Sequence, residues 1–132
     1  MPKGKELKLV GADTGFFYCL KDGDQTAQEV LQDCDIVVSI LTVFELRRAA
    51  LKGNKSAWYQ AQKFLEKFAT IMDVNKEVAE KAAKISHGTG MPAIDSLILA
   101  SLLTAGCKHI YTTDSHFETY KKKGIKIINL KT

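Results

Sequence analysis

The sequence contains little cysteine, no long apolar run and no tract of low complexity. Its three cysteines, Cys19, Cys34 and Cys107, are widely spaced and form no CxxC pair, so we predict neither a disulfide framework nor a cysteine-based zinc site. No segment approaches the roughly 20 apolar residues of a membrane span. Residues 1–8 also lack the apolar core of a signal peptide. We therefore expect a cytoplasmic protein with reduced thiols and no membrane association.

Length and composition indicate one ordinary globular domain. A chain of 132 residues can bury one sizeable core but is too short to promise two. No linker or internal repeat divides it, so we predict a single domain over residues 1–132. The 45% share of hydrophobic residues excludes an intrinsically disordered chain. The net charge of +4 helps an approach to phosphate but does not by itself establish a nucleic-acid partner.

Strand-like and helix-like segments alternate along the whole chain. We predict strands over residues 7–12, 35–41, 109–112 and 125–130, and a strand or loop over 71–74. Helices are predicted over 26–31, 42–52, 56–69, 75–86 and 92–105, with a brief helix or turn over 115–124. This alternation is typical of a parallel sheet with helices on both faces. The predicted fold class is therefore α/β.

Two local patterns set the expected helix boundaries. Thr42 and Glu45 have the spacing of a capping box, which predicts a helix start at Thr42. Residues 87–92, "HGTGMP", read as a break between helices. Pro92 then suits the first turn of the next helix, because its missing N–H would have no partner there.

Four acidic residues fall where predicted strands lead into helices. Asp13 follows the first strand, Glu45 lies just after the second, and Asp114 follows the strand over 109–112. Each of these three also has a structural explanation, as a turn, capping-box or helix-cap residue. Asp95 is different, because it lies in an apolar helix where an unpaired carboxylate would be costly. We expect a positive group near Asp95.

A metal ion is the interpretation that best balances these charges. Ligands of parallel sheets bind beyond the carboxyl ends of the strands, so the four acids are expected to share one crevice. Arg47, Arg48 or a lysine could neutralise part of their charge. Four carboxylates without a His/Cys spacing motif favour a hard ion such as Mg²⁺ or Mn²⁺. Such a site is suited to phosphoryl chemistry.

Four stretches together resemble the PIN-domain nucleases, and in particular the VapC-type toxins of toxin–antitoxin pairs. The matching segments are "VGADTGFFYCL", "VVSILTVFELRR", "GMPAIDSLILASLLTAG" and "IYTTDSHF", which contain Asp13, Glu45, Asp95 and Asp114 in that order. The resemblance implies a three-layer fold with a short, mostly parallel sheet flanked by helices. It also implies that these four acids are catalytic and hold one or two Mg²⁺ or Mn²⁺ ions.

The resemblance assigns supporting roles to three further residues. Thr112 matches the hydroxyl residue two positions before the last acid, and Thr14 follows the first acid directly. His116 is a departure, because many relatives have an aspartate two positions after the last acid. A histidine there is able to contact phosphate or a second metal ion, and it leaves the number of metal ions open.

The implied activity is hydrolysis of RNA phosphodiesters by a metal-activated water. Single-stranded or looped RNA is the expected substrate, because the bases of A-form duplexes are hard to reach. Arg47 and Arg48 are candidate RNA-binding residues beside Glu45, whereas the run Lys121–Lys123 is expected to be a solvated face. By analogy, an antitoxin is a candidate partner, and a homodimer is expected through the helices over residues 42–69.

Other functions remain open at the level of sequence. A PIN-fold domain could bind RNA or a partner without catalysis, and a PIN nuclease could process RNA without any antitoxin. A receiver-like signalling domain also places carboxylates at strand ends, but it needs paired acids early in the chain, where only Asp13 is present. A dinucleotide-binding domain is disfavoured because no GxGxxG follows the first strand.

Overall fold

A computed structural model describes residues 7–67 and 69–131. Residues 1–6, Thr132 and Phe68 of the predicted helix over 56–69 lie outside this description. Five strands form one sheet in the order β3-β2-β1-β4-β5, and every neighbouring pair is parallel. The α/β prediction is thereby confirmed. The strands are β1 (Lys8–Ala12), β2 (Cys34–Ser39), β3 (Ala69–Met72), β4 (His109–Thr112) and β5 (Lys126–Asn129).

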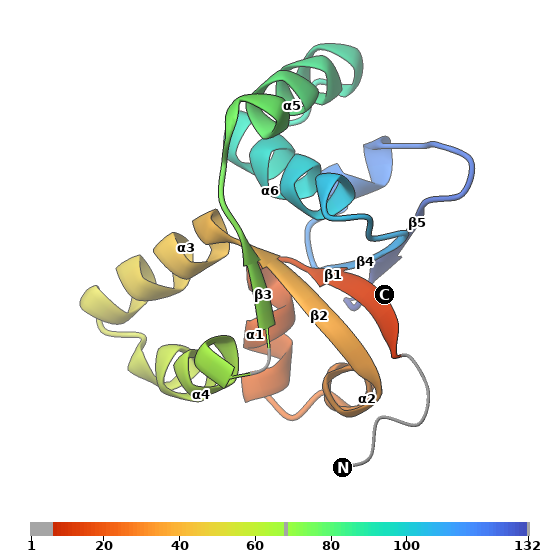
Figure 1. Ribbon diagram of the computed structural model, residues 1–132. Coiled ribbons are helices and arrows are strands. Elements are labelled where there is room, and N and C mark those ends of the chain that lie inside the picture. The colour runs from red at the N-terminus through yellow and green to blue at the C-terminus, as the bar shows by residue number, and fades with distance from the viewer. Residues whose placement is uncertain (1–6, 68, 132) are drawn as a thin grey trace.

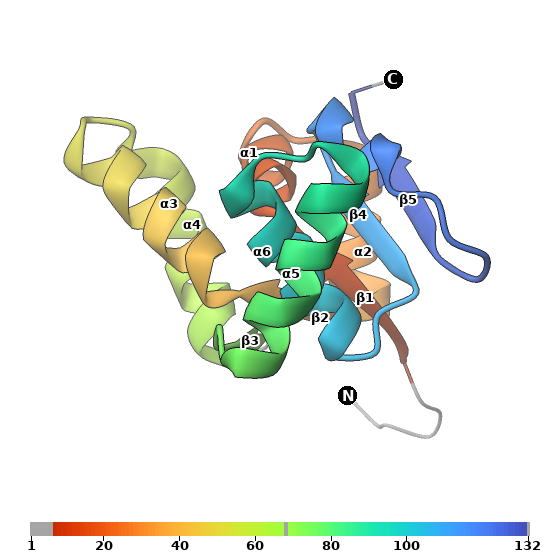
Figure 2. The same cartoon turned by 90° about the horizontal axis from the view of Figure 1, so that it is seen from above.

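Helices cover both faces of the sheet, so the molecule has three layers (Figure 1). The same layers are visible from above (Figure 2). One apolar cluster joins the sheet to α1 (Thr14–Lys21), α2 (Gln25–Asp33), α3 (Ile40–Leu51) and α4 (Lys55–Lys67). The other joins it to α5 (Lys76–Thr89), α6 (Ala93–Thr104) and the 3₁₀-helix η1 (Ser115–Thr119). No helix in the described ranges is long and apolar enough to cross a membrane.

The β-branched run of β2 serves both layers. Ile36 and Val38 point into the first cluster, whereas Val37 points into the second. Successive side chains of a strand alternate between the faces of a sheet, so a strand covered on both sides must be apolar at every position. All three side chains are at most 1% exposed, as the unbroken run predicted.

Several predicted boundaries are wrong. β2 ends at Ser39 and α3 begins at Ile40, because the Ser39 hydroxyl accepts a hydrogen bond from the Leu41 N–H at 3.1 Å and caps the helix. The predicted capping box of Thr42 and Glu45 therefore does not form. Helix α5 continues through the predicted break as far as Thr89 and ends where Gly90 adopts a left-handed conformation with φ 77°. Pro92 is the residue before α6 rather than part of its first turn.

Helix α1 has no counterpart among the predicted helices, because its sequence TGFFYCLK carries no clear apolar period. Phe16 and Phe17 are both buried in the first cluster. The helix is instead defined at its start by Asp13, whose side chain accepts a hydrogen bond from the Phe16 N–H. Tertiary packing of two aromatic residues thus outweighs the weak local pattern.

The strand order determines where a ligand site can form. The chain moves outward from β1 through β2 to β3 and then returns to the other side of β1 with β4. This reversal is a topological switch point, and ligands of open α/β sheets bind beside it at the carboxyl ends of the strands. The order also differs from the 2-1-3-4-5 arrangement of receiver domains, which excludes that alternative. Asp13 comes directly after β1, and Asp114 comes two residues after the end of β4.

Candidate functional site

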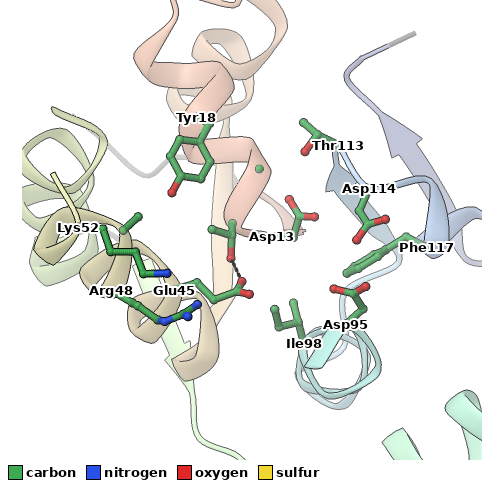
Figure 3. A pocket seen from close by; sticks show the side chains of 13 residues that line it. Asp13, Tyr18, Glu45, Arg48, Lys52, Asp95, Ile98, Thr113, Asp114 and Phe117 are labelled. Carbon is green, nitrogen blue, oxygen red and sulfur yellow. Dashed lines mark hydrogen bonds between the residues drawn. The ribbon is translucent and has the colours of Figure 1, made fainter. Parts of the chain in front are cut away.

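A hollow of about 420 Å³ lies at this switch point. All four acids predicted from the sequence line it, together with basic, hydroxyl and apolar side chains. In Figure 3, Asp95 and Asp114 lie on one side, Arg48 and Lys52 on the other, and Asp13 and Glu45 between them. We call this hollow the acidic pocket. Its lining residues include Asp13, Glu45, Asp95, Asp114, Arg48 and Lys52.

Asp13 is the most buried acid of the pocket, with 5% of its surface exposed. One carboxylate oxygen, Oδ1, accepts a hydrogen bond from the Phe16 N–H at 3.1 Å. The other, Oδ2, accepts one from the Thr112 hydroxyl at 2.5 Å. Asp13 therefore caps α1 and also forms part of the wall of the pocket. A carboxylate at the first helix N-terminus also opposes binding of a pyrophosphate there, which disfavours a dinucleotide-binding domain.

Thr112 links the acids that follow β1 and β4. Its hydroxyl donates to Asp13, and its oxygen accepts a hydrogen bond from the Asp114 N–H at 2.9 Å. The side chain is fully buried, so its rotamer is fixed by packing. Thr112 thus supports Asp13 directly and Asp114 through its backbone.

Glu45 is oriented by a hydroxyl from another element. The Thr14 Oγ1 atom lies 2.5 Å from Glu45 Oε1 and 3.3 Å from Thr42 Oγ1. These contacts join the start of α1 to α3. Thr14 therefore holds the Glu45 carboxylate toward the pocket, in place of the capping-box contact expected from sequence.

Within the described part of the chain, Asp95, Asp114 and His116 form a group of potential metal ligands. One ligand atom of each lies within 4.8 Å of the other two, an arrangement able to hold a metal ion. His116 Nδ1 is 3.0 Å from Asp114 Oδ1 and 3.6 Å from Asp95 Oδ2. Asp114 also caps η1, because its Oδ1 accepts a hydrogen bond from the His116 N–H at 2.9 Å. His116 is the side chain nearest to Asp95 that is able to carry positive charge, in place of the arginine or lysine considered from the sequence.

Two carboxyl groups of the pocket hold their protons more tightly than usual. Burial raises the pKa of Asp13 to about 6, and the nearby charge of Asp114 adds to this effect. The pKa of Asp95 is also raised to about 6, chiefly by burial and then by the hydrogen bond and charge of Asp114. The nearby His116 lowers this pKa in part. Both carboxyls therefore lack enough positive charge around them. A divalent cation would supply it.

The two predicted arginines separate in the structure. Arg48 lines the acidic pocket, and so does Lys52 one turn further along α3. Arg47 instead lies over the Trp58 ring, 5.4 Å from its centroid, and does not line the pocket. The helical period could have shown this, because Glu45, Arg48 and Lys52 fall on one face of a helix and Arg47 does not. Lys52 is the residue that the sequence prediction missed.

A comparison with known protein families finds the PIN domain, which matches residues 12–123. The chain belongs to the PIN domain family. A comparison with curated protein sequences gives no match. The sequence-based assignment to this family is confirmed, and it covers all four acids of the pocket.

Solved structures share the fold of this PIN domain at low sequence identity. A toxin–antitoxin complex from Klebsiella pneumoniae has 17% identity and a TM-score of 0.71, covering 92% of this chain and 97% of that one. DNA-bound VapBC from Salmonella typhimurium has 20% identity and a TM-score of 0.69, covering 94% and 98%. FitAcB from Neisseria gonorrhoeae has 24% identity and a TM-score of 0.62, covering 92% and 97%. At these identities the similarity establishes the fold alone.

The residues of the pocket suit a divalent cation. Carboxylate oxygens are preferred ligands of Mg²⁺ and Mn²⁺, and here several converge where two of them have raised pKa values. Asp95, Asp114 and His116 are close enough to share one ion. Their mixed oxygen and nitrogen donors favour a metal that also accepts imidazole.

Proposed function

We propose that this PIN domain is a Mg²⁺- or Mn²⁺-dependent endoribonuclease. The observation that carries the proposal is the convergence of Asp95, Asp114 and His116 beside the buried Asp13 carboxylate. A bound divalent ion would polarise the scissile phosphate and activate the attacking water. Asp95, Asp114 and His116 are the residues proposed to hold it, with Asp13 and Glu45 completing the negative wall of the pocket.

The remaining residues of the pocket position the acids and the substrate. Thr112 and Thr14 fix the orientations of Asp13 and Glu45 through hydrogen bonds. Arg48 and Lys52 present positive charge on the opposite wall, where they offset repulsion between the carboxylates and the RNA backbone. Because water rather than the ribose 2′-hydroxyl is the attacking group, the products are a 5′-phosphate and a free 3′-hydroxyl.

A toxin role is the biological setting that we propose for this activity. The support is the shared fold with proteins solved as toxin–antitoxin complexes. An antitoxin that inhibits this chain is expected to place an arginine among the pocket carboxylates, where it would form charge-assisted hydrogen bonds. Protection of the pocket from Mn²⁺ by a co-expressed partner would support this setting, whereas full Mn²⁺ access in the complex would contradict it.

The exposed apolar face of α3 and α4 supports the proposed homodimer. Phe44 is 58% exposed, Leu51 73% and Tyr59 60%. Side chains of this size and polarity are usually covered in a protein-protein interface. The mass of the chain in solution, compared with that of Phe44→Glu, tests this face: a wild-type monomer would contradict the dimer.

Cleavage of single-stranded RNA tests the nuclease proposal. Wild type and Asp95→Asn are compared in Mn²⁺, Mg²⁺ and EDTA, with folding followed by circular dichroism. We expect cleavage by the wild type with either metal, none in EDTA, and a loss of at least a hundredfold in the folded variant. Equal activity of Asp95→Asn would remove the mechanism. Metal binding without any turnover would instead support the non-catalytic alternative.

A further inference from the structure

A second hollow, lined by lysines, lies at the end of η1, beside Thr119 and Tyr120. It has a volume of about 640 Å³ and is formed by α5, the end of α6 and the segment that follows η1. A neighbouring hollow of about 500 Å³ shares that segment. In Figures 1 and 2 this segment, between β4 and β5, runs beside α5 and α6. We call the two hollows together the lysine groove; its lysines are Lys81, Lys84, Lys121, Lys122, Lys123 and Lys126.

The positive charge of the lysine groove is not balanced by carboxylates nearby. In residues 7–67 and 69–131, no carboxylate forms an ion pair with any of its six lysines. Glu118 is the single acid among the described residues that line it. The side chain of Glu118 accepts a hydrogen bond from Asn129 Nδ2 at 2.9 Å. Six positive charges around one negative charge create a surface that attracts a polyanion.

The floor of the groove suits the bases of a nucleic acid. Tyr120 lines both hollows and is partly exposed, and the partly exposed Ile125 lies with it. Leu103 of α6 adds a further apolar surface. Aromatic and apolar side chains framed by lysines are the usual combination in sites for single-stranded nucleic acids, where bases stack and phosphates meet positive charge.

Two elements connect the lysine groove to the acidic pocket. Phe117 of η1 lines the pocket, and Tyr120, three positions later, lines the groove. On α6, Asp95 lines the pocket and Leu103 lines the groove, about 12 Å apart along the helix axis. A single strand of RNA that leaves the acidic pocket past η1 would therefore reach the lysines within a few nucleotides.

We propose that the lysine groove binds the single-stranded RNA segment that flanks the scissile phosphate. This inference rests on the nuclease function proposed above, because it takes the acidic pocket as the point of cleavage. Lys121–Lys123 are exposed, as the sequence predicted, and the proposal adds an RNA-binding role because the fold brings Lys81 and Lys84 of α5 to the same groove. RNA is favoured over an acidic protein segment by the aromatic floor and by the direct connection to the pocket.

The test measures RNA binding separately from cleavage. Fluorescence anisotropy in the Asp95→Asn background compares a labelled single-stranded RNA of about 20 nucleotides with one of about two, lengths on either side of common single-strand site sizes of about 4–16 nucleotides. We expect the combined substitution Lys84→Gln, Lys121→Gln and Lys122→Gln to weaken binding of the long RNA by roughly tenfold or more. The slope of log K against log salt for the long RNA should become less steep by about 2. Binding of the short RNA should not change.

Two matched variants control for folding and for loss of charge in general. Arginine at the same three positions should retain binding of the long RNA. The substitution Lys55→Gln, Lys63→Gln and Lys67→Gln removes the same charge from exposed positions of α4 and should have little effect. Equal weakening by both glutamine triples, or no weakening by the groove triple, would overturn the inference while leaving cleavage by the wild type intact. Binding through the groove without any cleavage would overturn the nuclease proposal and support the groove.

Discussion

The Thr112 hydroxyl donates a hydrogen bond to the Asp13 carboxylate across the boundary between β4 and β1, at 2.5 Å between Oγ1 and Oδ2. The two residues are 99 positions apart in sequence and both are buried. This contact joins the strands on either side of the switch point. Because the same hydroxyl accepts the Asp114 N–H, one side chain sets the spacing of two acids in the pocket.

Replacing Thr112 by valine should therefore lower both stability and metal affinity. Valine keeps the shape of the side chain but leaves a buried carboxylate without one of its donors, which typically costs about 1.5–3 kcal/mol for a charged acceptor. Urea unfolding at neutral pH in EDTA measures this loss. Thr112→Ser is the control, because it retains the donor and should lose much less. Equal stability of the valine variant and the wild type would show that the contact contributes nothing.

The raised pKa of Asp13 predicts an unusual dependence of stability on pH. The folded protein holds this proton up to about pH 6, whereas the unfolded chain releases it near the ordinary value of 3.8. Without metal, the contribution of Asp13 to the free energy of unfolding should therefore fall as pH rises from about 4 to 6. The total change is at most about 3 kcal/mol.

Asp13→Asn isolates this effect, because asparagine can still cap α1 but does not titrate. In EDTA, the stability of the variant relative to the wild type should increase between pH 4 and pH 7. Urea unfolding at several pH values gives the difference, and Mn²⁺ at pH 7 should stabilise the wild type more than the variant. A difference that stays constant with pH would contradict the burial of an unbalanced charge.

His116 is expected to tune the choice of metal. Imidazole favours borderline ions such as Co²⁺ over Mg²⁺, so the ratio of Co²⁺ to Mg²⁺ affinity should fall by roughly tenfold in His116→Asp, in line with typical losses at metal sites. Titration calorimetry and the visible absorption of bound Co²⁺ give this ratio without relying on activity. An unchanged affinity ratio and an unchanged spectrum would mean that His116 contacts Asp114 without binding the metal.

Arg48 and Arg47 should have different effects although they are neighbours in sequence. Arg48→Ala should raise KM for RNA and reduce the salt slope by about 0.7, the value for one contact to a single strand. Arg47→Ala should leave KM unchanged and cost about 0.5–1 kcal/mol of stability, because it loses its contact with Trp58. Steady-state kinetics at several salt concentrations, with thermal unfolding, separates the two. A larger KM effect in Arg47→Ala would reverse their proposed roles.

The sequence predicted the layers of the fold and the four acids because these depend on local patterns. The β-branched run of β2 and the apolar helix α6 must be buried wherever they lie. Strand ends then carry Asp13 and Asp114 to the same edge. The family was identified from the same segments, whereas the order of the strands was not predicted and comes from the structure.

The ends of helices, and features that depend on tertiary contacts, were less accessible from the sequence. The start of α3 is set by the Ser39 hydroxyl, a better-placed cap than the Thr42 pattern suggested. Helix α5 passes through Gly88 because Gly90 supplies the left-handed stop two residues later. Lys81 and Lys122 meet in one groove only through the packing of α5 against the segment after η1, which no local pattern contains.

The central claim is that a divalent cation binds among Asp95, Asp114 and His116. Titration calorimetry of Mn²⁺ into the folded, metal-free protein at pH 7.5 tests it most directly, with Asp95→Asn/Asp114→Asn as the comparison. Saturable Mn²⁺ binding by the wild type that is lost in the folded double variant is the predicted result. No binding by the wild type, or equal binding by the double variant, would contradict the claim.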